Sequence, residues 1–405
     1  MRSIRTHPLF NPTALAEGWR ERLGGYSEDP EHEPHLLAAI AWLVRAQDAT
    51  PDSGISRAFS LAWHPYFGRR GWQPSYPETT GYIIPTLYGA SRRLGRGELS
   101  ARAERAARWE IEIQLPTGAV RGGVIGEPPT PAVFNTGQVL LGWLAAFEES
   151  GEGGGAFADA ARRAACYLMA TLDADGHWRR GNSRFARADA TLYNTRTAWA
   201  LAEAGARLDD AQFTDAAARS LRAAARLQTP NGWLPSCCLS DPERPLLHTL
   251  AYAIRGFLEG GRVLSDEHLI QAAERAAAAL QTAVGADGWM PGRYHSDWSA
   301  AADWSCLTGQ AEMANNWMRL ADITGDPKWL DSVPDVLSFL KRTQNRRSHE
   351  RGVRGGIKGS WPVSGEYGAY EVLNWATKFF ADALMRHEAI RTGGLRSASP
   401  VSALA

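Results

Sequence analysis

Residues 134–148 read FNTGQVLLGWLAAFE, and residues 193–205 read YNTRTAWALAEAG. In both stretches an aromatic residue, an asparagine and a threonine come before a run whose apolar residues recur every three to four positions. That spacing is typical of an amphipathic helix. The two stretches therefore predict equivalent helices that begin near Thr136 and Thr195.

The same kind of junction recurs along the whole chain. Comparable stretches are ETTGYIIPTLYGA at residues 78–90, LHTLAYAIRGFLEGG at 247–261, LTGQAEMANNWMRLADITG at 307–325 and EYGAYEVLNWATKFFADALM at 366–385. When the six stretches are aligned on Thr80, Thr136, Thr195, Thr249, Thr308 and Tyr367, their starts are 56, 59, 54, 59 and 59 residues apart. A nearly constant period of this length indicates a repeat architecture.

A second helical pattern precedes each junction, as in HLLAAIAWLVRAQ at residues 35–47 and FTDAAARSLRAAARLQ at residues 213–228. These first helices carry more charge than the second ones, and turn sequences such as TPNG and GADG follow them. Few windows alternate with the two-residue period of a strand. The sequence therefore predicts an all-α protein of six helical hairpins.

The small and apolar second helices suit an inner layer, and the charged first helices suit an outer one. Six hairpins in two such layers predict a closed (α/α)6 toroid, or barrel. We expect a single toroid domain at residues 35–390, an N-terminal extension at 1–34 and a flexible C-terminal tail at 391–405. In a closed ring the starts of the inner helices face a common funnel.

Composition narrows the choice of partners. Lys plus Arg and Asp plus Glu number 44 each, so the formal net charge is zero. The protein therefore has no overall electrostatic attraction to nucleic acid or to an acidic membrane. The first 25 residues lack the apolar core of a secretory signal, and no apolar run is long enough for a membrane span, so we expect a cytoplasmic protein. The four cysteines have no zinc-binding spacing and no nucleotide-binding glycine motif follows a strand, which predicts no metal and no cofactor. The oligomeric state stays open.

The predicted funnel is rich in polar and aromatic side chains. Its expected substrate-binding residues are Tyr76, Tyr82, Trp72, Asn135, Gln138, Tyr193, Asn194, Arg196, Arg255, Trp304, Gln310, Tyr367 and Trp361. Amide and guanidinium groups bind sugar hydroxyls and aromatic faces cover C–H patches, so the pattern predicts a carbohydrate substrate. The basic residues between Lys341 and Lys358 could form a patch for an anionic sugar polymer, or alternatively a solvated loop. For each tryptophan, packing between hairpins is an equal alternative.

The arrangement of these six units resembles that of the six-hairpin toroid enzymes. They include glycosidases such as unsaturated glucuronyl hydrolases, sugar 2-epimerases of the N-acylglucosamine type and several polysaccharide lyases, with terpenoid cyclases and protein prenyltransferases as a second group. The resemblance extends from about His35 to Met385 and rests on architecture. It implies an enzyme that acts on a polysaccharide or oligosaccharide, with glycoside hydrolysis as the first expectation.

Hydrolysis of a glycosidic bond needs a protonated carboxyl group and a second carboxylate. Glu78, Asp303 and Glu366 are the acids best placed for these roles at the predicted inner-helix starts. Glu78 and Glu366 belong to the first and last hairpins, which are neighbours in a closed ring, so we expect them to face each other. Helix capping is the alternative for each acid, although Thr79 and Thr80 can cap the first inner helix in place of Glu78.

His248, Tyr252 and Arg255 support a different chemistry. Their separations of four and three residues put them on one face of the fourth inner helix. A uronate C5-epimerase or a polysaccharide lyase needs an arginine, asparagine or glutamine to neutralise the sugar carboxylate, and a tyrosine or histidine to remove the C5 proton. His248 and Tyr252 could remove the proton, and Arg196 and Arg255 could form the clamp or, alternatively, structural salt bridges.

Three further possibilities remain open. A terpenoid cyclase or prenyltransferase-like toroid is one, although the sequence lacks the DxDD and DDxxD runs usual in terpenoid cyclases. A zinc enzyme would need Cys306, His248 and Asp303 to converge. A non-catalytic toroid that binds a glycan within a polysaccharide-synthesis assembly would use the same polar ring without turnover.

Overall fold

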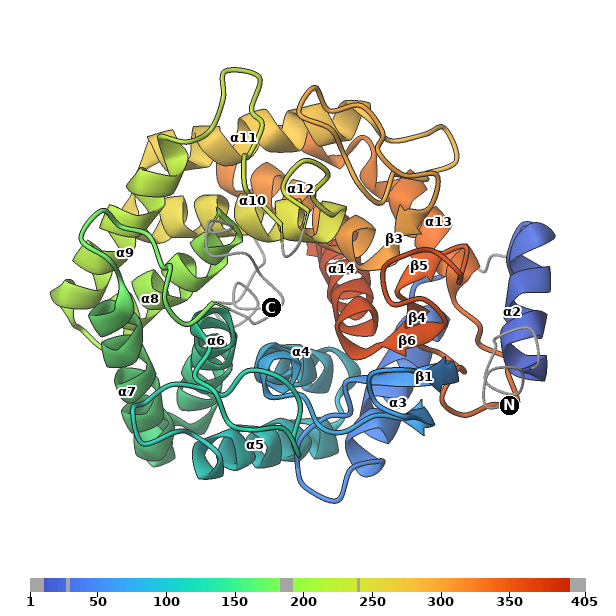
Figure 1. The fold of residues 1–405 in the computed structure, drawn as a ribbon, viewed down its shortest axis with the longest axis horizontal. Helices are drawn as coiled ribbons and strands as arrows, with labels where there is room; N and C mark the ends of the chain where they lie inside the picture. The colour runs from blue at the N-terminus through green and yellow to red at the C-terminus, as the bar shows by residue number, and fades with distance from the viewer. Residues whose placement is uncertain (1–10, 27–29, 183–191, 239–240, 394–405) are drawn as a thin grey trace.

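Six helical hairpins form a closed ring in the computed structural model, which describes residues 11–26, 30–182, 192–238 and 241–393 (Figure 1). The outer helices are α3 (Glu33–Asp48), α5 (Gly97–Glu112), α7 (Gly155–Thr171), α9 (Ala211–Ala225), α11 (Glu267–Thr282) and α13 (Val333–Thr343). The inner helices are α4 (Pro77–Leu94), α6 (Val133–Ser150), α8 (Thr195–Arg207), α10 (Leu247–Leu264), α12 (Leu307–Thr324) and α14 (Asn374–Gly393). The predicted (α/α)6 toroid is confirmed.

Each inner helix packs against the next one, and α14 closes the ring against α3 and α4. Glycine permits the close approach at several of these contacts. A Cβ atom on Gly137 of α6 would lie 2.9 Å from the Cα of Thr197 in α8, and one on Gly309 of α12 would lie 2.6 Å from the backbone nitrogen of His248 in α10. Any larger side chain at Gly309 would therefore push α12 away from His248.

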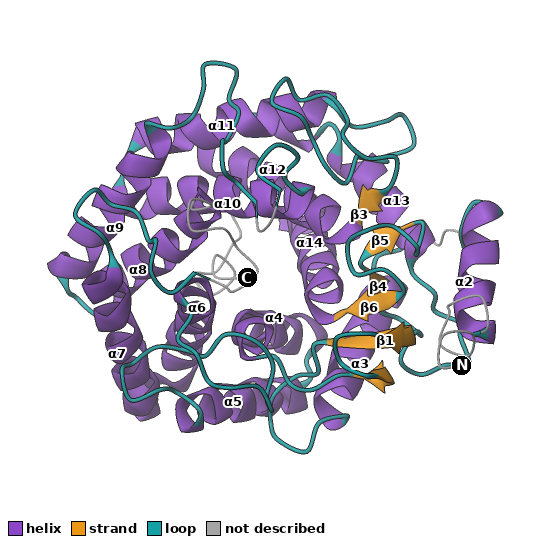
Figure 2. Cartoon of the chain, in the orientation of Figure 1, coloured by secondary structure: helices purple, strands orange, loops and turns teal. Residues whose placement is uncertain are grey.

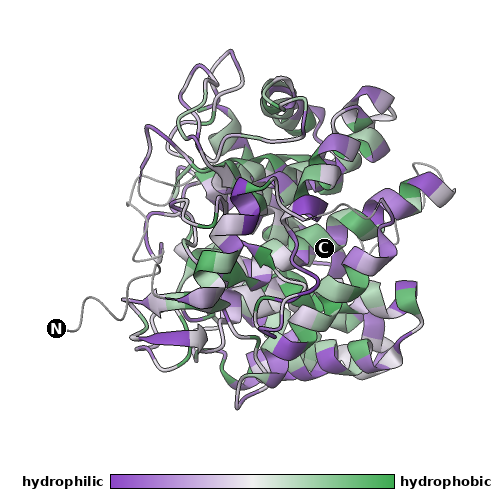
Figure 3. Cartoon of the chain, turned by 90° about the vertical axis from the view of Figure 1, so that its right-hand side faces the viewer, coloured by the Kyte–Doolittle hydropathy of each residue, from purple (hydrophilic) through white to green (hydrophobic). Residues whose placement is uncertain are grey.

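Alanine-rich faces join the outer helices to the inner ones. On α11, for example, Ala272, Ala273, Ala276 and Ala277 have no exposed surface, and their spacing is that of one helix face. Figure 3 shows the resulting alternation of apolar and hydrophilic residues along the helices. None of the described helices combines the length and hydrophobicity of a membrane-spanning segment.

In the first, second and sixth hairpins a threonine ties the inner helix to the loop before it. Thr80 Oγ1 accepts a hydrogen bond from the amide of Ile55 (3.0 Å) and donates one to the carbonyl of Tyr76 (2.9 Å). Thr136 and Thr377 make the same pair of bonds in the second and sixth hairpins. The recurring threonine therefore has a structural role at the start of the inner helix.

The alignment of the sixth junction on Tyr367 was wrong. Helix α14 begins only at Asn374, and its equivalent of the recurring threonine is Thr377. The reason is that the chain forms short strands before this helix: β4 (Ile357–Lys358), β5 (Ser360–Trp361) and β6 (Glu371–Leu373).

A small antiparallel sheet joins the first hairpin to the last (Figure 2). Its strand order is β2 (Arg69–Trp72), β1 (Ala58–His64), β6 and β4, while β3 (Ser305–Cys306) pairs separately with β5. The sheet was not predicted, because residues 58–62 of β1 are all buried and so show no two-residue alternation. Pairing of β1 with β6 brings the segments before α4 and α14 side by side.

Three short 3-10 helices complete the described elements: η2 (Gly151–Gly154), η3 (Leu192–Asn194) and η4 (Pro327–Leu330). Helix α2 (Pro12–Arg22) packs outside the ring. A buried ion cluster anchors α2. Lys358 Nζ lies 2.9 Å from Glu17 and 3.1 Å from Glu21, and each of the three side chains is only 2% exposed. Lys341 is also buried and donates to the carbonyl of Pro30. These two lysines were wrongly assigned to a basic surface, since both anchor the N-terminal segment.

Glu110 on α5 is fully buried, and neither of its carboxylate oxygens has a hydrogen-bond partner within the described part of the chain. Burial, together with the nearby charge of Asp52, raises its pKa well above the ordinary value of 4.5. In the unfolded chain Glu110 ionises near that value, whereas the fold keeps it protonated. The wild-type protein therefore loses stability as the pH rises above 4.5, the pKa of Glu110 in the unfolded chain.

We expect Glu110→Met to raise the free energy of unfolding by about 1–3 kcal/mol at pH 8, because methionine removes an unsatisfied buried polar group. The gain should be smaller at pH 4, where the carboxyl is protonated in both states. Denaturant unfolding at the two pH values measures it, with Glu104→Met as the control, because the Glu104 side chain, on the same helix, is 44% exposed. An equal gain at both pH values would contradict the argument.

Candidate active site

A cavity of about 200 Å³ opens where the inner helices begin. It is lined by Arg57, Tyr76, Glu78, Tyr82, Phe134, Asn135, Tyr193, His248, Thr249, Tyr252, Tyr367 and Trp375. The structure thus brings together, from the residues predicted for the funnel, Tyr76, Glu78, Tyr82, Asn135, Tyr193, His248, Tyr252 and Tyr367. The helix starts converge because the ring places them all at one end.

Glu78 is the carboxyl group that lines this cavity within the described residues. The hydroxyl of Tyr76 donates a hydrogen bond to its Oε2 at 2.5 Å. Burial raises the pKa of Glu78 to about 7, while this hydrogen bond and the charges of Arg57 and Arg196 oppose the rise. The raised pKa lets this carboxyl group donate or accept a proton near neutral pH.

Replacing Tyr76 by Phe is expected to shift the pH dependence of kcat. The lost hydrogen bond stabilised the carboxylate, so the pKa of Glu78 rises, and a step that needs the protonated acid persists to higher pH. A hydrogen bond of about 0.5–1.5 kcal/mol corresponds to a shift of up to about one pH unit. A pH–rate profile measures it, and Tyr193→Phe is the matched control, because the Tyr193 hydroxyl has no hydrogen-bond partner within the described chain.

A histidine and a glutamate form a buried pair beside the cavity. His248 Nδ1 lies 2.5 Å from Oε2 of Glu312, and both side chains are at most 6% exposed. The imidazole packs against the rings of Tyr252 and Tyr367, with centroid distances of 4.3 and 5.4 Å. A carboxylate at Nδ1 keeps the proton on that nitrogen, which leaves Nε2 as the acceptor. The pair thus has the composition of a general base with its orienting group.

Arg57 supplies a cation at the cavity wall. Its Nη1 donates to Oε1 of Gln73 (2.8 Å) and to Glu371 (3.0 Å), and its guanidinium lies over the rings of Trp375 (5.0 Å) and Phe67 (5.4 Å). These contacts fix the side chain from several sides. Glu371 is 2% exposed and does not line the cavity, so it acts by holding Arg57 in place.

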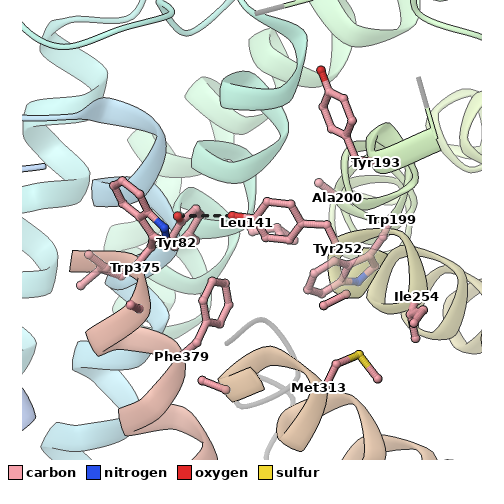
Figure 4. Packing of buried hydrophobic residues seen from close by; sticks show 14 of the residues in the cluster. Tyr82, Leu141, Tyr193, Trp199, Ala200, Tyr252, Ile254, Met313, Trp375 and Phe379 are labelled. Atoms are coloured by element: carbon pink, nitrogen blue, oxygen red, sulfur yellow. Dashed lines mark hydrogen bonds between the residues drawn. The ribbon is translucent and has the colours of Figure 1, made fainter. Parts of the chain in front are cut away.

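A layer of aromatic rings separates the cavity from buried cations. The hydroxyls of Tyr82 and Tyr252 lie 3.4 Å apart, near Phe379 and Trp375 (Figure 4). Arg196 lies 4.9 Å from the centroid of Tyr252 and donates from Nε to Gln138 at 2.7 Å. Arg196 and Gln138 are therefore not among the lining residues, in contrast to the prediction. They support the tyrosine layer instead.

The structure does not bring the other two predicted acids to the cavity. Asp303 is exposed, and neither it nor Glu366 is a lining residue. The Glu366 side chain is 62% exposed and pairs with Arg293 at 3.3 Å. The loop between β5 and β6 carries Glu366 to the surface, so the expected pairing with Glu78 is not formed.

The remaining predicted residues also lie outside the lining: Trp72, Asn194, Arg255, Trp304, Gln310 and Trp361. Arg255 is buried and pairs with Glu259 at 3.1 Å, so the predicted sugar clamp is a structural ion pair. Gln310 donates to the carbonyl of Gly288 at 2.7 Å. Trp72 packs against Trp42 with the ring centroids 5.2 Å apart. These side chains join parts of the fold.

Several cavity residues were missed from the sequence: Arg57, Phe134, Thr249 and Trp375. Phe134 and Trp375 each lie next to an asparagine at an inner-helix start, Asn135 and Asn374, which is a signal that the repeat alignment could have used. Arg57 precedes the unpredicted strand β1 and had no such signal. Within the described chain, no three His, Cys, Asp or Glu side chains are grouped to hold a metal ion.

Neither a protein-family model nor a curated protein matches the sequence. Among solved structures, an unsaturated glucuronyl hydrolase specific for heparin is similar, with a TM-score of 0.68, 18% identity and coverage of 90% of this chain and 99% of that one. The unsaturated glucuronyl hydrolase of Bacillus sp. GL1 has a TM-score of 0.67 and 16% identity, with coverage of 91% of this chain and 100% of that one. A D-mannose isomerase has a TM-score of 0.66 and 12% identity, with coverage of 89% of this chain and 100% of that one. The chain thus has the (α/α)6 toroid fold of these carbohydrate enzymes.

Proposed function

We propose that the protein is a carbohydrate-active enzyme that hydrolyses a glycosidic bond in an oligosaccharide or polysaccharide, with Glu78 as the general acid. The observation that carries the proposal is the place of Glu78, a buried carboxyl group that lines a cavity walled by tyrosines and Trp375 and that the Tyr76 hydroxyl holds at 2.5 Å. Burial also raises the pKa of this carboxyl group to about 7. A general acid works best when its pKa lies near the operating pH. The fold shared with the glucuronyl hydrolases supports the same conclusion.

The second group of the reaction is His248, held by Glu312. Glu78 gives its proton to the glycosidic oxygen, which leaves with the departing sugar. His248 Nε2 takes a proton from water, and the resulting hydroxide bonds to the sugar carbon as the C–O bond breaks. This assignment replaces the second carboxylate of the usual pair by a histidine–glutamate pair.

The substrate class follows from Arg57. Within the described residues it makes its protein hydrogen bonds through Nη1, which leaves Nε and Nη2 for a ligand. A guanidinium binds carboxylates strongly and with defined geometry. We therefore propose a sugar that carries a carboxylate, such as a uronic acid, in the inner cavity.

Hydrolysis of paired substrates in ¹⁸O-labelled water tests this function. Uronate-containing oligosaccharides and their neutral counterparts are incubated with the protein, and the products are analysed by mass spectrometry. We expect chain shortening, one ¹⁸O atom in each product pair, and faster reaction of the uronate members. Failure to shorten any member of the panel, together with binding of the glycans, would instead indicate a glycan-binding protein.

Sugar isomerisation or epimerisation is the second candidate, because Glu78 and the His248–Glu312 pair give the cavity two groups able to move a proton at carbon. A D-mannose isomerase has the same fold. This reaction in D₂O would place deuterium on a sugar carbon without shortening the chain. A lyase would instead release an unsaturated product without taking up ¹⁸O.

A further inference from the structure

A second cavity, of about 340 Å³, adjoins the first. It is lined by Arg57, His64, Tyr66, Phe67, Tyr76, Gly123, Val124 and Glu127. Arg57 and Tyr76 line both cavities, so the two spaces meet at these side chains. We call the two spaces the inner cavity, which contains Glu78, and the outer cavity.

Two loops build the outer cavity. The end of β1 provides the ring of His64, and the turn between β1 and β2 provides those of Tyr66 and Phe67. The Tyr66–Phe67 and His64–Phe67 centroids lie 4.9 and 4.8 Å apart. Val124 and Glu127 come from the loop before α6. The Tyr66 hydroxyl donates a hydrogen bond to Glu127 and so bridges the two loops. The outer cavity is therefore formed by an aromatic wall and a carboxylate wall that contact each other.

The position of Glu78 relates the two cavities to the reaction. Tyr76 lines both of them and its hydroxyl holds the Glu78 carboxyl at 2.5 Å. The proton donor therefore lies close to the boundary between the cavities. A glycosidic oxygen within its reach has one sugar ring in the inner cavity and the next ring in the outer cavity.

We propose that the outer cavity is the subsite for the sugar that leaves, and that it takes a neutral sugar ring. The proposal rests on the hydrolase function proposed above. Together the two cavities have the size of an ordinary small-molecule site, about 300–1,000 Å³. The rings of Tyr66 and Phe67 suit the C–H patches of a sugar, and the Glu127 carboxylate accepts hydrogen bonds from its hydroxyls. Arg57 also lines the outer cavity, but its charge is assigned above to the carboxylate of the inner sugar, so the outer ring meets the charge of Glu127, which disfavours an anionic ring.

The experiment compares kcat/KM for two substrates that share the inner sugar. Methyl glucuronide has a leaving group too small for the outer cavity, and a glucuronyl-glucose disaccharide fills it. Tyr66 is 51% exposed, so truncation of its side chain spares the core. We expect Tyr66→Ala to lower the disaccharide-to-methyl ratio by about 3- to 10-fold, and Tyr66→Phe, which keeps the ring, to lower it less. Trp63→Ala, an exposed ring on β1 that does not line the outer cavity, is the control and should leave the ratio as in the wild type.

A third substrate tests the charge preference. A disaccharide with an anionic leaving sugar should react more slowly than glucuronyl-glucose, and Glu127→Gln should reduce that difference by about threefold or more. If the wild type hydrolyses both first substrates and Tyr66→Ala leaves their ratio unchanged, the outer subsite is refuted and the hydrolase function stands. If the wild type hydrolyses neither, the proposed function itself fails. An unchanged preference in Glu127→Gln would refute the neutral-ring assignment.

Discussion

Glu78→Gln is expected to lower kcat by about 100- to 10,000-fold, the range that positioned general acids contribute. Glutamine has nearly the same shape and can still accept the hydrogen bond from Tyr76, but it has no proton of suitable acidity to give to the leaving oxygen. In the wild type, kcat should fall as the pH rises above about 7, because the required carboxyl then loses its proton. This alkaline fall should disappear from the residual activity of the variant.

Single-turnover rates with a uronate oligosaccharide measure the effect, and glycan affinity shows whether the cavity remains intact. The two acids that the structure places outside the cavity provide the decisive comparison. If Glu366→Gln or Asp303→Asn lowered kcat as much as Glu78→Gln does, Glu78 would not be the sole acid and a pair of carboxylates would be favoured.

His248→Ala is expected to lower kcat by about 100- to 10,000-fold, since it removes the group proposed to activate water. Glu312→Gln should lower kcat less, by about 10- to 100-fold. Its amide oxygen still accepts from Nδ1, but it no longer stabilises the positive charge that the imidazole gains. Because Glu312 acts through His248, the double variant should be no slower than His248→Ala alone.

A double-mutant cycle on kcat tests this coupling, with His295→Ala, an exposed histidine, as the control for loss of an imidazole. Multiplicative losses in the double variant would show that Glu312 has an independent role. If His248→Ala instead kept full ¹⁸O incorporation and normal kcat, the assigned base would be wrong.

The architecture could be predicted because each hairpin repeats the same physical solution. An outer helix with a small-residue face packs on an inner helix whose first turn carries the recurring threonine. Both patterns can be read directly from the amino-acid sequence. The sixth junction shows where this fails. Strands β4 to β6 are two to three residues long and owe their existence to pairing with distant segments, so local sequence carries little sign of them.

The candidate site was predictable where the repeat alone sets position. Glu78, Asn135 and His248 all follow from the rule that inner-helix starts share one end of the ring. Arg57 and Glu312 could not be predicted, because their places depend on the pairing of β1 with β6 and on the contact of α10 with α12. Asp303 and Glu366 lie close in sequence to inner-helix starts, yet both are exposed and do not line the cavity, because the sequence does not show the direction in which their loops run.

The pairing of β1 with β6 also determines when, during synthesis of the chain, the active-site cavity can form. Ser60 and Glu371, which the sheet brings into hydrogen-bond contact, are 311 positions apart in the chain. A ribosome must therefore finish nearly the entire sixth hairpin before Arg57 can receive its carboxylate partner. Nascent chains that have made only five hairpins lack Tyr367 and Trp375, which complete the cavity wall. Contacts so distant in sequence form late in folding, so catalytic competence should arise only at the final closure of the ring.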